Sequence, residues 1–527
     1  MKVCSTSFFA GLFLLLSTAL SAQRYDLLIR NGQVFEGSAG ATLWKADIAI
    51  KGEKILRVAP GIKGKAAREI DARGLVVSPG FIDLHTHLEP LPLDPQAQSH
   101  VRQGVTTALG GPDGGGPLGI GSYLDTLAAI GIGLNAAYLI GHNTVRNHVM
   151  GLVNRAPTAD ELRQMEDWIE KAMKEGAFGI STGLKYLPGT YAKLDEIVAL
   201  SKVAARHGGI YTSHLREEGL GLLEGVAEAI QIAELAGIPV VLTHHKAIGL
   251  KMWGSSVKTL AMVDSARTKG LDIMIDQYPY TASFTGISVL IPSWALEGHP
   301  VREFARRCED PLLRDSIKQG IIFNLLNDRG GGDLRRIQFG SFDWKPELNG
   351  KTLYDWAILQ GLEPNVEHGA DLVIEAQIHR GAGCIFHAIS EEDVRRIMKH
   401  PQTMVASDGR LSQPGKDHPH PRAYGTFPRV LGHYVREEKV LTLEEALFKM
   451  TGQPALRLGL NKRGFIRKGY FADLTLFDPA TVKDKSTFEA PHQYPEGIPY
   501  VLVNGKMAVD NGAYQDVRAG KTLRRRD

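Results

Sequence analysis

Hydrophobic and polar positions follow two different patterns along the chain. Near the start, YDLLIRNGQVFEG and ADIAIKGEKILRVAPG alternate apolar and polar residues between Gly and Asn turns, which is typical of antiparallel strands. From about Leu75, short apolar runs alternate with amphipathic segments of helical period, and this pattern indicates βα units around a parallel sheet. After about Lys462 the first pattern returns in GFIRKGYFADLTLFDP and YVLVNGKMAVDNG. NGQVFEG and VNGKMAVDNG resemble matching hairpins, so we expect both chain ends to form one small β domain.

Eight apolar runs in the middle of the chain predict strands. They are FIDLHTHL, GVTTALGG, AAYLIGHN, AFGIST, GIYTSHL, PVVLTHHK, LDIMIDQYPY and MVASDG. Helical patterns lie between them; TADELRQMEDWIEKAMKEG, for example, begins with a capping box from Thr158 to Glu161 and ends at Gly176. Eight strands with intervening helices predict an α/β protein with a (β/α)8 TIM-type barrel over residues 79–461. Residues 23–78 and 462–527 are then predicted to form a small β-sandwich domain.

A long segment separates the seventh and eighth predicted strands, at about residues 283–403. It contains helical and strand-like pieces of its own. An insertion at this place would lie over the barrel mouth, where it could act as a lid or a specificity element. The alternative is a peripheral insertion that packs only on the outside.

The first 22 residues have the layout of a secretory signal peptide. Lys2 precedes the apolar run FFAGLFLLLSTAL, and small residues around Ser21 and Ala22 would suit cleavage. The alternative is an uncleaved N-terminal anchor. No later segment is apolar enough over a sufficient length to span a bilayer, so we expect an exported protein, periplasmic or secreted, without stable membrane insertion after cleavage.

Composition excludes several classes of protein. The net charge is +3 over 527 residues, without a large basic block, so nothing favours a nucleic-acid partner. Removal of the signal peptide with Cys4 leaves only Cys308 and Cys384, which allow one disulfide at most. No CxxC pair is present, so a thiolate zinc cluster is also excluded.

Histidines and one aspartate follow the predicted strands. His85 and His87 end the first strand, and residues two apart in a strand point to the same face. His214 ends the fifth strand, His244 and His245 follow the sixth, and Asp408 follows the eighth. The carboxyl ends of barrel strands meet at one face, and imidazole with carboxylate is a ligand set for zinc. The sequence therefore predicts a site for Zn²⁺ or a similar divalent ion.

The ordered motifs resemble the amidohydrolase superfamily and, more narrowly, the D-aminoacylase (N-acyl-D-amino-acid deacylase) family. They run over nearly the whole chain: PGFIDLHTHLEP, GVTTALGGPDGGG, GAFGISTGLKYLPGTYA, YTSHLREEG, LTHHKAIG, DQYPYTAS, VASDG, HPRAYGTFPRVLG and KGYFADLTLFDP. The resemblance implies that His85 and His87 hold one metal. His214 and His244 would hold the other, with His244 preferred over His245 because it takes the place of the family's single histidine.

The resemblance also implies roles for residues beside the metals. Asp408 would be the general base and acid, taking a proton from the attacking water and delivering one to the leaving amine. Arg422, in HPRAYG, and Lys246, in HHK, are candidates for holding a substrate carboxylate, and Tyr186 could bond the scissile carbonyl. The alternative for Tyr186, Lys246 and Arg422 is a purely structural position.

One position departs from the family pattern. Many members have a metal-bridging cysteine soon after the second strand, where this sequence has Asp113 in GGPDGGG. Asp113 could bridge directly, or it could be a turn residue or a partner of a ligand histidine. The other candidate is Lys185, carboxylated as in related amidohydrolases; an unmodified ammonium beside two dications would be repelled. We expect Lys185 to be the bridge.

The predicted function is metal-dependent hydrolysis of the amide bond of a small-molecule N-acyl amino acid, of D configuration. One or two zinc ions would be the cofactor. A dipeptidase, or a cyclic-amide hydrolase of the hydantoinase or dihydroorotase kind, is the alternative within the superfamily. A non-catalytic binding protein would be expected to lose ligands or the base, whereas all of them are present here. The sequence predicts no particular oligomeric state.

Overall fold

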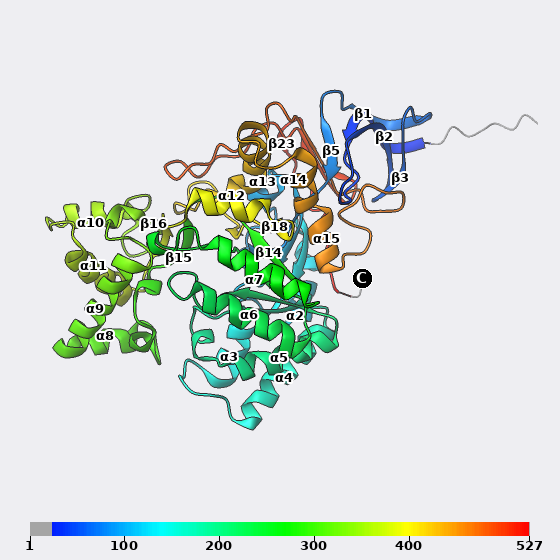
Figure 1. The fold of residues 1–527 in the computed structure, drawn as a ribbon. Helices are drawn as coiled ribbons and strands as arrows, with labels where there is room; N and C mark the ends of the chain where they lie inside the picture. Colours follow the sequence, from blue (N-terminus) through cyan, green and yellow to red (C-terminus); the bar gives the residue numbers. More distant parts are fainter. Residues whose placement is uncertain (1–23, 526–527) are drawn as a thin grey trace, which may run out of the picture.

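A computed structural model describes residues 24–525 of the chain (Figure 1). The predicted signal peptide lies outside the described residues. Within residues 24–525, no helix combines the length and the apolar character needed to cross a membrane.

The predicted strands of the central sheet are all present and pair in parallel. One sheet has the order β10-β11-β12-β13-β14-β18, a second has the order β6-β8-β9, and β19 pairs in parallel with β7. Only Leu139 separates β9 from β10, so β9 and β10 form one interrupted strand that joins the two sheets. The pairings therefore follow chain order and lead from the last strand back to the first. The bounds are β6 (Phe81–Asp83), β7 (Thr86–His87), β8 (Val105–Gly110), β9 (Asn135–Tyr138), β10 (Ile140–Gly141), β11 (Gly179–Gly183), β12 (Ile210–His214), β13 (Val240–Leu242), β14 (Ile273–Gln277), β18 (Thr403–Val405) and β19 (Gly409–Arg410).

Helices on the outside of these strands alternate with them along the chain (Figure 1). In α4, Thr158 and Glu161 form the predicted capping box, and buried Met165, Ile169 and Ala172 face the core at helical spacing. The bounds of the outer helices are α2 (Ile120–Ile130), α3 (His142–Met150), α4 (Ala159–Lys174), α5 (Leu194–Arg206), α6 (Leu222–Ala236), α7 (Ser256–Thr268), α12 (Glu391–Lys399), α14 (Leu443–Met450) and α15 (Gly452–Leu458).

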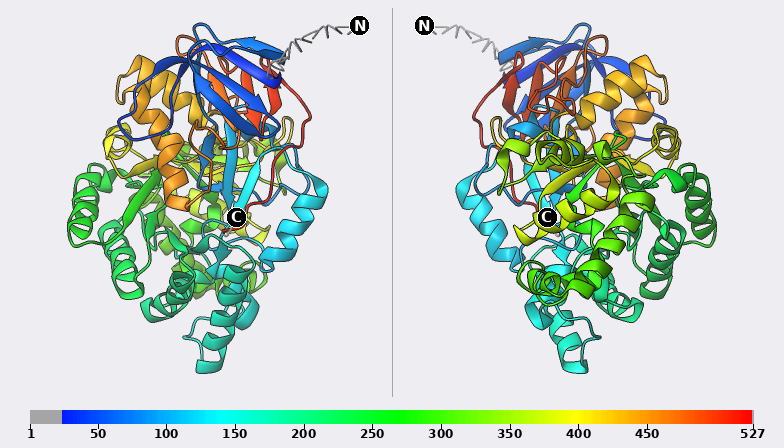
Figure 2. Two further views of the ribbon diagram at one scale, coloured as in Figure 1. Left: turned by 90° about the vertical axis from the view of Figure 1, so that its right-hand side faces the viewer. Right: turned by 90° about the vertical axis from the view of Figure 1, so that its left-hand side faces the viewer.

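Both ends of the described chain build one sheet, which lies together at the top of Figure 2. Its strands are β1 (Arg24–Val34), β2 (Trp44–Lys51), β3 (Lys54–Ala59), β4 (Lys65–Asp71), β5 (Val76–Pro79), β20 (Leu474–Phe477), β21 (Tyr500–Val503), β22 (Lys506–Asp510) and β23 (Ala513–Tyr514). VNGKMAVDNG forms a hairpin in which β21 and β22 turn at Asn504. In NGQVFEG, residues Asn31–Val34 end the bulged strand β1, where Asp47 accepts the backbone N–H of left-handed Asn31, and β1 pairs antiparallel with β2.

Residues after β23 leave this sheet. The backbone of Lys521 and Leu523 bonds that of Ala136 in β9, so the end of the described chain packs on the parallel strands. The predicted small domain at 462–527 therefore includes a tail that supports the other part of the molecule.

The segment between β14 and β18 forms a lobe of its own, visible at the left of Figure 1. Its antiparallel sheet has the order β15-β17-β16, with β15 (Ser283–Gly286), β16 (Ile337–Ser341) and β17 (Gly383–Phe386). Helices α8 (Arg302–Glu309), α9 (Pro311–Asn327), α10 (Leu353–Leu359) and α11 (Val366–Ile378) complete a separate hydrophobic core around Trp356. Helix α12 instead packs on α7 and β18, so this lobe ends near Phe386, before the expected boundary at 403.

Candidate metal centre and cavity

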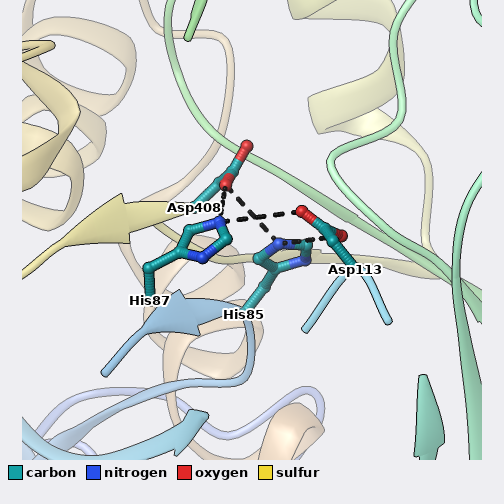
Figure 3. A group of neighbouring side chains, drawn as sticks. All are labelled: His85, His87, Asp113 and Asp408. Carbon is teal, nitrogen blue, oxygen red and sulfur yellow. Dashed lines mark ion pairs between the residues drawn. The ribbon is translucent and has the colours of Figure 1, made fainter. Parts of the chain in front are cut away.

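Two histidines and two aspartates converge at the carboxyl ends of the first, second and last parallel strands (Figure 3). The Nε2 of His85 lies 3.5 Å from both Asp113 Oδ1 and Asp408 Oδ1. The Nε2 of His87 lies 3.6 Å from Asp113 Oδ2 and 3.2 Å from Asp408 Oδ1. His85 directly precedes β7 and His87 ends it, and Asp408 directly precedes β19, which pairs with β7. The backbone N–H of Asp408 donates to the backbone oxygen of His85 at 2.9 Å, which holds Asp408 beside the histidines.

A second group shares Asp113. His244 Nε2 lies 3.5 Å from Asp113 Oδ1, His214 Nδ1 lies 3.9 Å from Asp113 Oδ2, and the two histidine nitrogens are 2.7 Å apart. Asp113 thus stands between the two histidine pairs, with one carboxylate facing both. His245 is turned away and bonds Thr259, in keeping with the preference for His244 over His245.

These separations suit a bound cation better than direct hydrogen bonds. Two ligands about 2.0–2.1 Å from a tetrahedral zinc ion are about 3.4 Å apart, which is close to most of the N···O distances. The His85 Nε2 and Asp113 Oδ1 atoms are buried and lack a hydrogen-bond partner among the described residues. Buried polar atoms left without a partner are costly, so the donor set fits a divalent cation.

The outward nitrogens of all four histidines face other carboxylates. His85 Nδ1 lies 3.7 Å from Asp276, and His87 Nδ1 lies 3.4 Å from Glu89. One carboxylate serves the other two histidines: Glu218 lies 3.1 Å from His244 Nδ1 and 3.6 Å from His214 Nε2. Such outer carboxylates fix the tautomer and orientation of metal-binding histidines, so this arrangement supports the same interpretation.

Three residues of the cluster have a left-handed backbone. The φ angles are 54° at Asp113, 36° at His244 and 48° at Asp408. This region is uncommon for residues with a side chain, although aspartate and histidine adopt it more often than most. Strained residues persist where the surroundings hold them, which is common at functional sites.

The charges of the cluster are strongly coupled. Burial raises the pKa of Asp113, but the neighbouring His85 and His244 outweigh it and hold the pKa well below its ordinary range. Burial lowers the pKa of His214 to about 3. Asp113 is therefore anionic and His214 neutral at pH 7, and these are the forms that bind a metal.

The structure does not bring Lys185, the bridge expected from the sequence, between the two histidine pairs. Its Nζ donates to both carboxylate oxygens of Glu217, at 2.8 and 3.0 Å, and the residue does not line the cavity. Asp113, the second choice from the sequence, occupies the position between the pairs. The glycine-rich loop turns at Asp113 and brings its side chain back toward the strand ends.

The three predicted substrate-binding residues all line the cavity above the cluster. Tyr186 accepts a hydrogen bond from Thr285, and the Nη1 of Arg422 lies 2.7 Å from Asp408. Lys246 is less available than expected. Its Nζ lies within hydrogen-bond distance of Glu218 and of both the Nδ1 and the backbone oxygen of His244, so the ammonium stabilises the cavity wall.

Four further residues beside the cluster or in the cavity were not predicted from the sequence: Glu218, Asp276, Glu89 and Arg329. The sequence contains a weak indication for two of them, their spacing from a predicted histidine. Glu89 follows HTH by two residues, and Glu218 follows His214 by four. Asp276 accepts the backbone N–H of His244 from a neighbouring strand, a relation that only the fold reveals. Arg329 enters the cavity from the inserted lobe.

The cavity has a volume of about 860 Å³, and several parts of the chain line it. The metal-binding cluster forms its floor. Strand β15 and Arg329 of the inserted lobe form one wall, and residues 408–423 form another. A volume of this size suits a small organic substrate.

Comparison with known proteins connects this site to characterised enzymes. The Amidohydrolase family matches residues 68–247 and 358–509, and the unmatched middle contains the first part of the inserted lobe. A D-aminoacylase of Alcaligenes xylosoxydans xylosoxydans is 35% identical, covering 96% of this chain and 98% of the relative. An N-acyl-D-glutamate deacylase of the same organism is 36% identical, covering 95% and 97%.

A solved structure extends the likeness to the fold. It is the crystal structure of N-acyl-D-glutamate deacylase from Bordetella bronchiseptica, complexed with zinc and a phosphonate mimic of the tetrahedral intermediate. The TM-score is 0.81 at 32% identity, covering 95% of this chain and 100% of that chain. The family match and these full-length relatives together show that the chain belongs to the amidohydrolase family.

Proposed function

We propose that this protein hydrolyses the amide bond of N-acyl-D-amino acids with the help of one or two bound zinc ions. The observation that carries the proposal is the cluster of four histidines around Asp113, in which His85 Nε2 and Asp113 Oδ1 are buried without a hydrogen-bond partner among the described residues. The D-aminoacylase and N-acyl-D-glutamate deacylase relatives support the substrate class.

The side chains of the cavity have distinct roles in this reaction. Bound metal supplies Lewis-acid chemistry that polarises a carbonyl and lowers the pKa of a water molecule. Asp408 takes the proton from the attacking water and delivers it to the leaving amine. Arg422 holds Asp408 in place and offers its remaining N–H groups to the substrate carboxylate, and Tyr186 lies where its hydroxyl can donate to the scissile carbonyl.

The organisation of the chain fits an exported enzyme of this kind. Parallel pairing that leads from β19 back to β7 supports a closed (β/α)8 barrel, and the sheet shared by both chain ends supports a small β-sandwich beside it. The sequence of residues 1–22 supports export to the periplasm or the medium.

A substrate panel tests the proposed function. Zinc-loaded protein should release free amino acid from N-acetyl-D-amino acids, and not from N-acetyl-L-amino acids, dipeptides or hydantoins. Asp408→Asn should retain metal and lower kcat by about 10²–10⁴-fold, as expected for loss of a general acid–base. Turnover of dipeptides or hydantoins, without turnover of N-acetyl-D-amino acids, would refute the assignment.

A further inference from the structure

Two side chains with roles in the proposed reaction are carried by loops. Asp113 lies in the glycine-rich loop after β8, and Tyr186 lies in the turn after β11. The centre of the Tyr186 ring is 4.5 Å from that of His214, so both loops reach the metal-binding cluster. Pairing within a sheet does not fix the position of a loop residue, so contacts outside the strands must hold these two side chains.

The side chain of Asn143 joins the turn that carries Tyr186 to helix α3. Asn143 is 8% exposed and lies near the start of α3, which directly follows β10. Its Oδ1 accepts the backbone N–H of Gly183 at 3.2 Å. Its Nδ2 donates to the backbone oxygens of Gly183 and Tyr186, at 3.0 and 3.3 Å. One amide group thus bonds both ends of the turn.

The loop that carries Asp113 packs against the same amide. A Cβ atom at Gly114 would lie 2.0 Å from Asn143 Oδ1. A Cβ atom at Gly183 would lie 2.2 Å from the backbone oxygen of Asp113. The backbone N–H of Thr144 donates to the Gly114 oxygen at 3.0 Å. The two glycines therefore permit a close contact between both loops and the start of α3.

Asn143 holds these loops from outside the cavity. It does not line the cavity, so it touches neither a bound substrate nor the metal-binding atoms. Its helix is anchored separately from the site, because the carboxylate of Glu196 bonds His142 Nε2 at 2.8 Å and Arg146 Nε at 3.0 Å. A rigid support of this kind keeps reacting groups in place through the backbone.

Loss of the Asn143 amide would release the turn. The N–H of Gly183, a buried residue, would lose its acceptor, and the oxygens of Gly183 and Tyr186 would each lose a donor. A buried N–H without a partner is unfavourable, so we expect the turn to rearrange and to move Tyr186. A displacement of about 1 Å at a reacting group can lower the rate by about 100-fold.

We propose that Asn143 is a positioning residue, which fixes the Tyr186 hydroxyl and the Asp113 carboxylate relative to each other. The inference rests on the proposed function, in which Tyr186 donates to the scissile carbonyl and Asp113 faces both histidine pairs. Asn143 acts on the reaction through these two residues.

A double-mutant cycle with Tyr186 tests the first part of the proposal. With zinc at saturation and an N-acetyl-D-amino acid that the wild type hydrolyses, Asn143→Ala should lower kcat by about 10–100-fold and change KM by about twofold or less. In a Tyr186→Phe background the same substitution should lower kcat by only about twofold, because the hydroxyl that it positions is absent. An equal loss of kcat in both backgrounds would overturn the assignment to Tyr186.

Two further variants separate positioning from folding. Asn135 is a fully buried asparagine whose amide bonds the backbone of Thr106 and the side chain of Asn504, outside the cavity. Asn135→Ala should lower stability but keep the wild-type kcat. Asn143→Asp keeps the volume and the acceptor for Gly183 but loses both donors, so it should still lower kcat without leaving a cavity. Wild-type kcat in both Asn143 variants, measured on folded protein, would overturn the proposal.

Zinc affinity tests the second part without any substrate. Competition with a chromophoric chelator should show that Asn143→Ala weakens zinc binding by about 10-fold, through displacement of Asp113, whereas Asn135→Ala keeps the wild-type affinity. Equal affinity in wild type and Asn143→Ala would overturn the assignment to Asp113. If no N-acyl-D-amino acid is hydrolysed, the proposed function fails, and the zinc measurement still decides whether Asn143 positions Asp113.

Discussion

Replacement of Glu218 by Gln is expected to weaken metal binding at the His214–His244 pair. The carboxylate of Glu218 faces the outward nitrogen of each histidine, at 3.1 and 3.6 Å. A glutamine has one acceptor oxygen and carries no charge, so it cannot serve both rings. Loss of such an outer partner typically costs 10–100-fold in metal affinity, and with two histidines affected we expect about 100-fold, or about 2.7 kcal/mol.

The neighbouring Glu217 provides a matched control. It carries the same side chain one residue earlier, but it pairs with Lys185 outside the cluster. Competition with a chromophoric chelator gives the zinc affinity, and elemental analysis gives the stoichiometry. Glu217→Gln should keep both values, whereas Glu218→Gln should weaken one zinc equivalent and leave any zinc at His85 and His87 unchanged.

Glu218 also pairs with Lys246, so Glu218→Gln should lower the stability of the protein as well as its zinc affinity. Removal of one partner from a buried ion pair typically costs about 3–5 kcal/mol of stability. The double variant Glu218→Gln with Lys246→Met removes the unpaired ammonium, so it should recover stability without recovering zinc affinity. Equal zinc affinity in wild type and Glu218→Gln, measured on folded protein, would refute the idea that Glu218 positions the histidines.

Three other predictions follow from the same geometry. Asp113→Ala should lose at least one metal per chain by elemental analysis, whereas Lys185→Met should keep the wild-type content and change the free energy of unfolding by less than about 1 kcal/mol. Burial lowers the pKa of His87, but the neighbouring Glu89 and Asp408 outweigh it and raise the pKa to about 10. The ring is therefore protonated at pH 7 and must lose a proton when zinc binds. Calorimetry should detect this release as a heat of zinc binding that changes with the ionisation enthalpy of the buffer. Burial lowers the pKa of His100 to about 4, so the unfolded chain binds the extra proton between pH 6.5 and 4 and stability falls as the pH falls. Between pH 7.5 and pH 5 this effect should lower the free energy of unfolding by about 2 kcal/mol. Denaturant unfolding at both pH values should show that His100→Gln loses about 2 kcal/mol less than wild type over this range. An equal loss in both proteins would contradict the prediction.

The strands and the clustered histidines were predictable from the sequence because they depend on local patterns. Period-two alternation and apolar runs identified the strands, and the rule that barrel sites lie at strand ends selected His85, His87, His214 and His244. Asp408 followed from the same rule. Each of these side chains takes its position from the strand that it follows, so knowing the strand was sufficient.

The choice between Asp113 and Lys185 was not predictable in this way, because it depends on the path of loops. Asp113 reaches the cluster through a left-handed residue in a glycine-rich loop, and Gly114 beside it has no room for a side chain next to Asn143. Lys185 turns toward Glu217, a residue 32 positions away. The sequence showed both candidates but not which loop turned inward.

The carboxylates around the histidines and the cationic side chains Lys246 and Arg422 form one site, because their charges nearly balance only when a cation is bound. Four carboxylates surround the histidines: those of Asp408, Glu218 and Asp276 are buried, and that of Asp113 is half-buried. Within residues 24–525, Lys246 and Arg422 each pair with one of these acids, which leaves two of the four negative charges without a cationic lysine or arginine partner. Before a cation binds, the raised pKa values of His85, His87 and His244 let protons supply the missing charge. One divalent ion balances the same two charges and uses the same nitrogens, so the protons occupy a site that the chain builds for a metal.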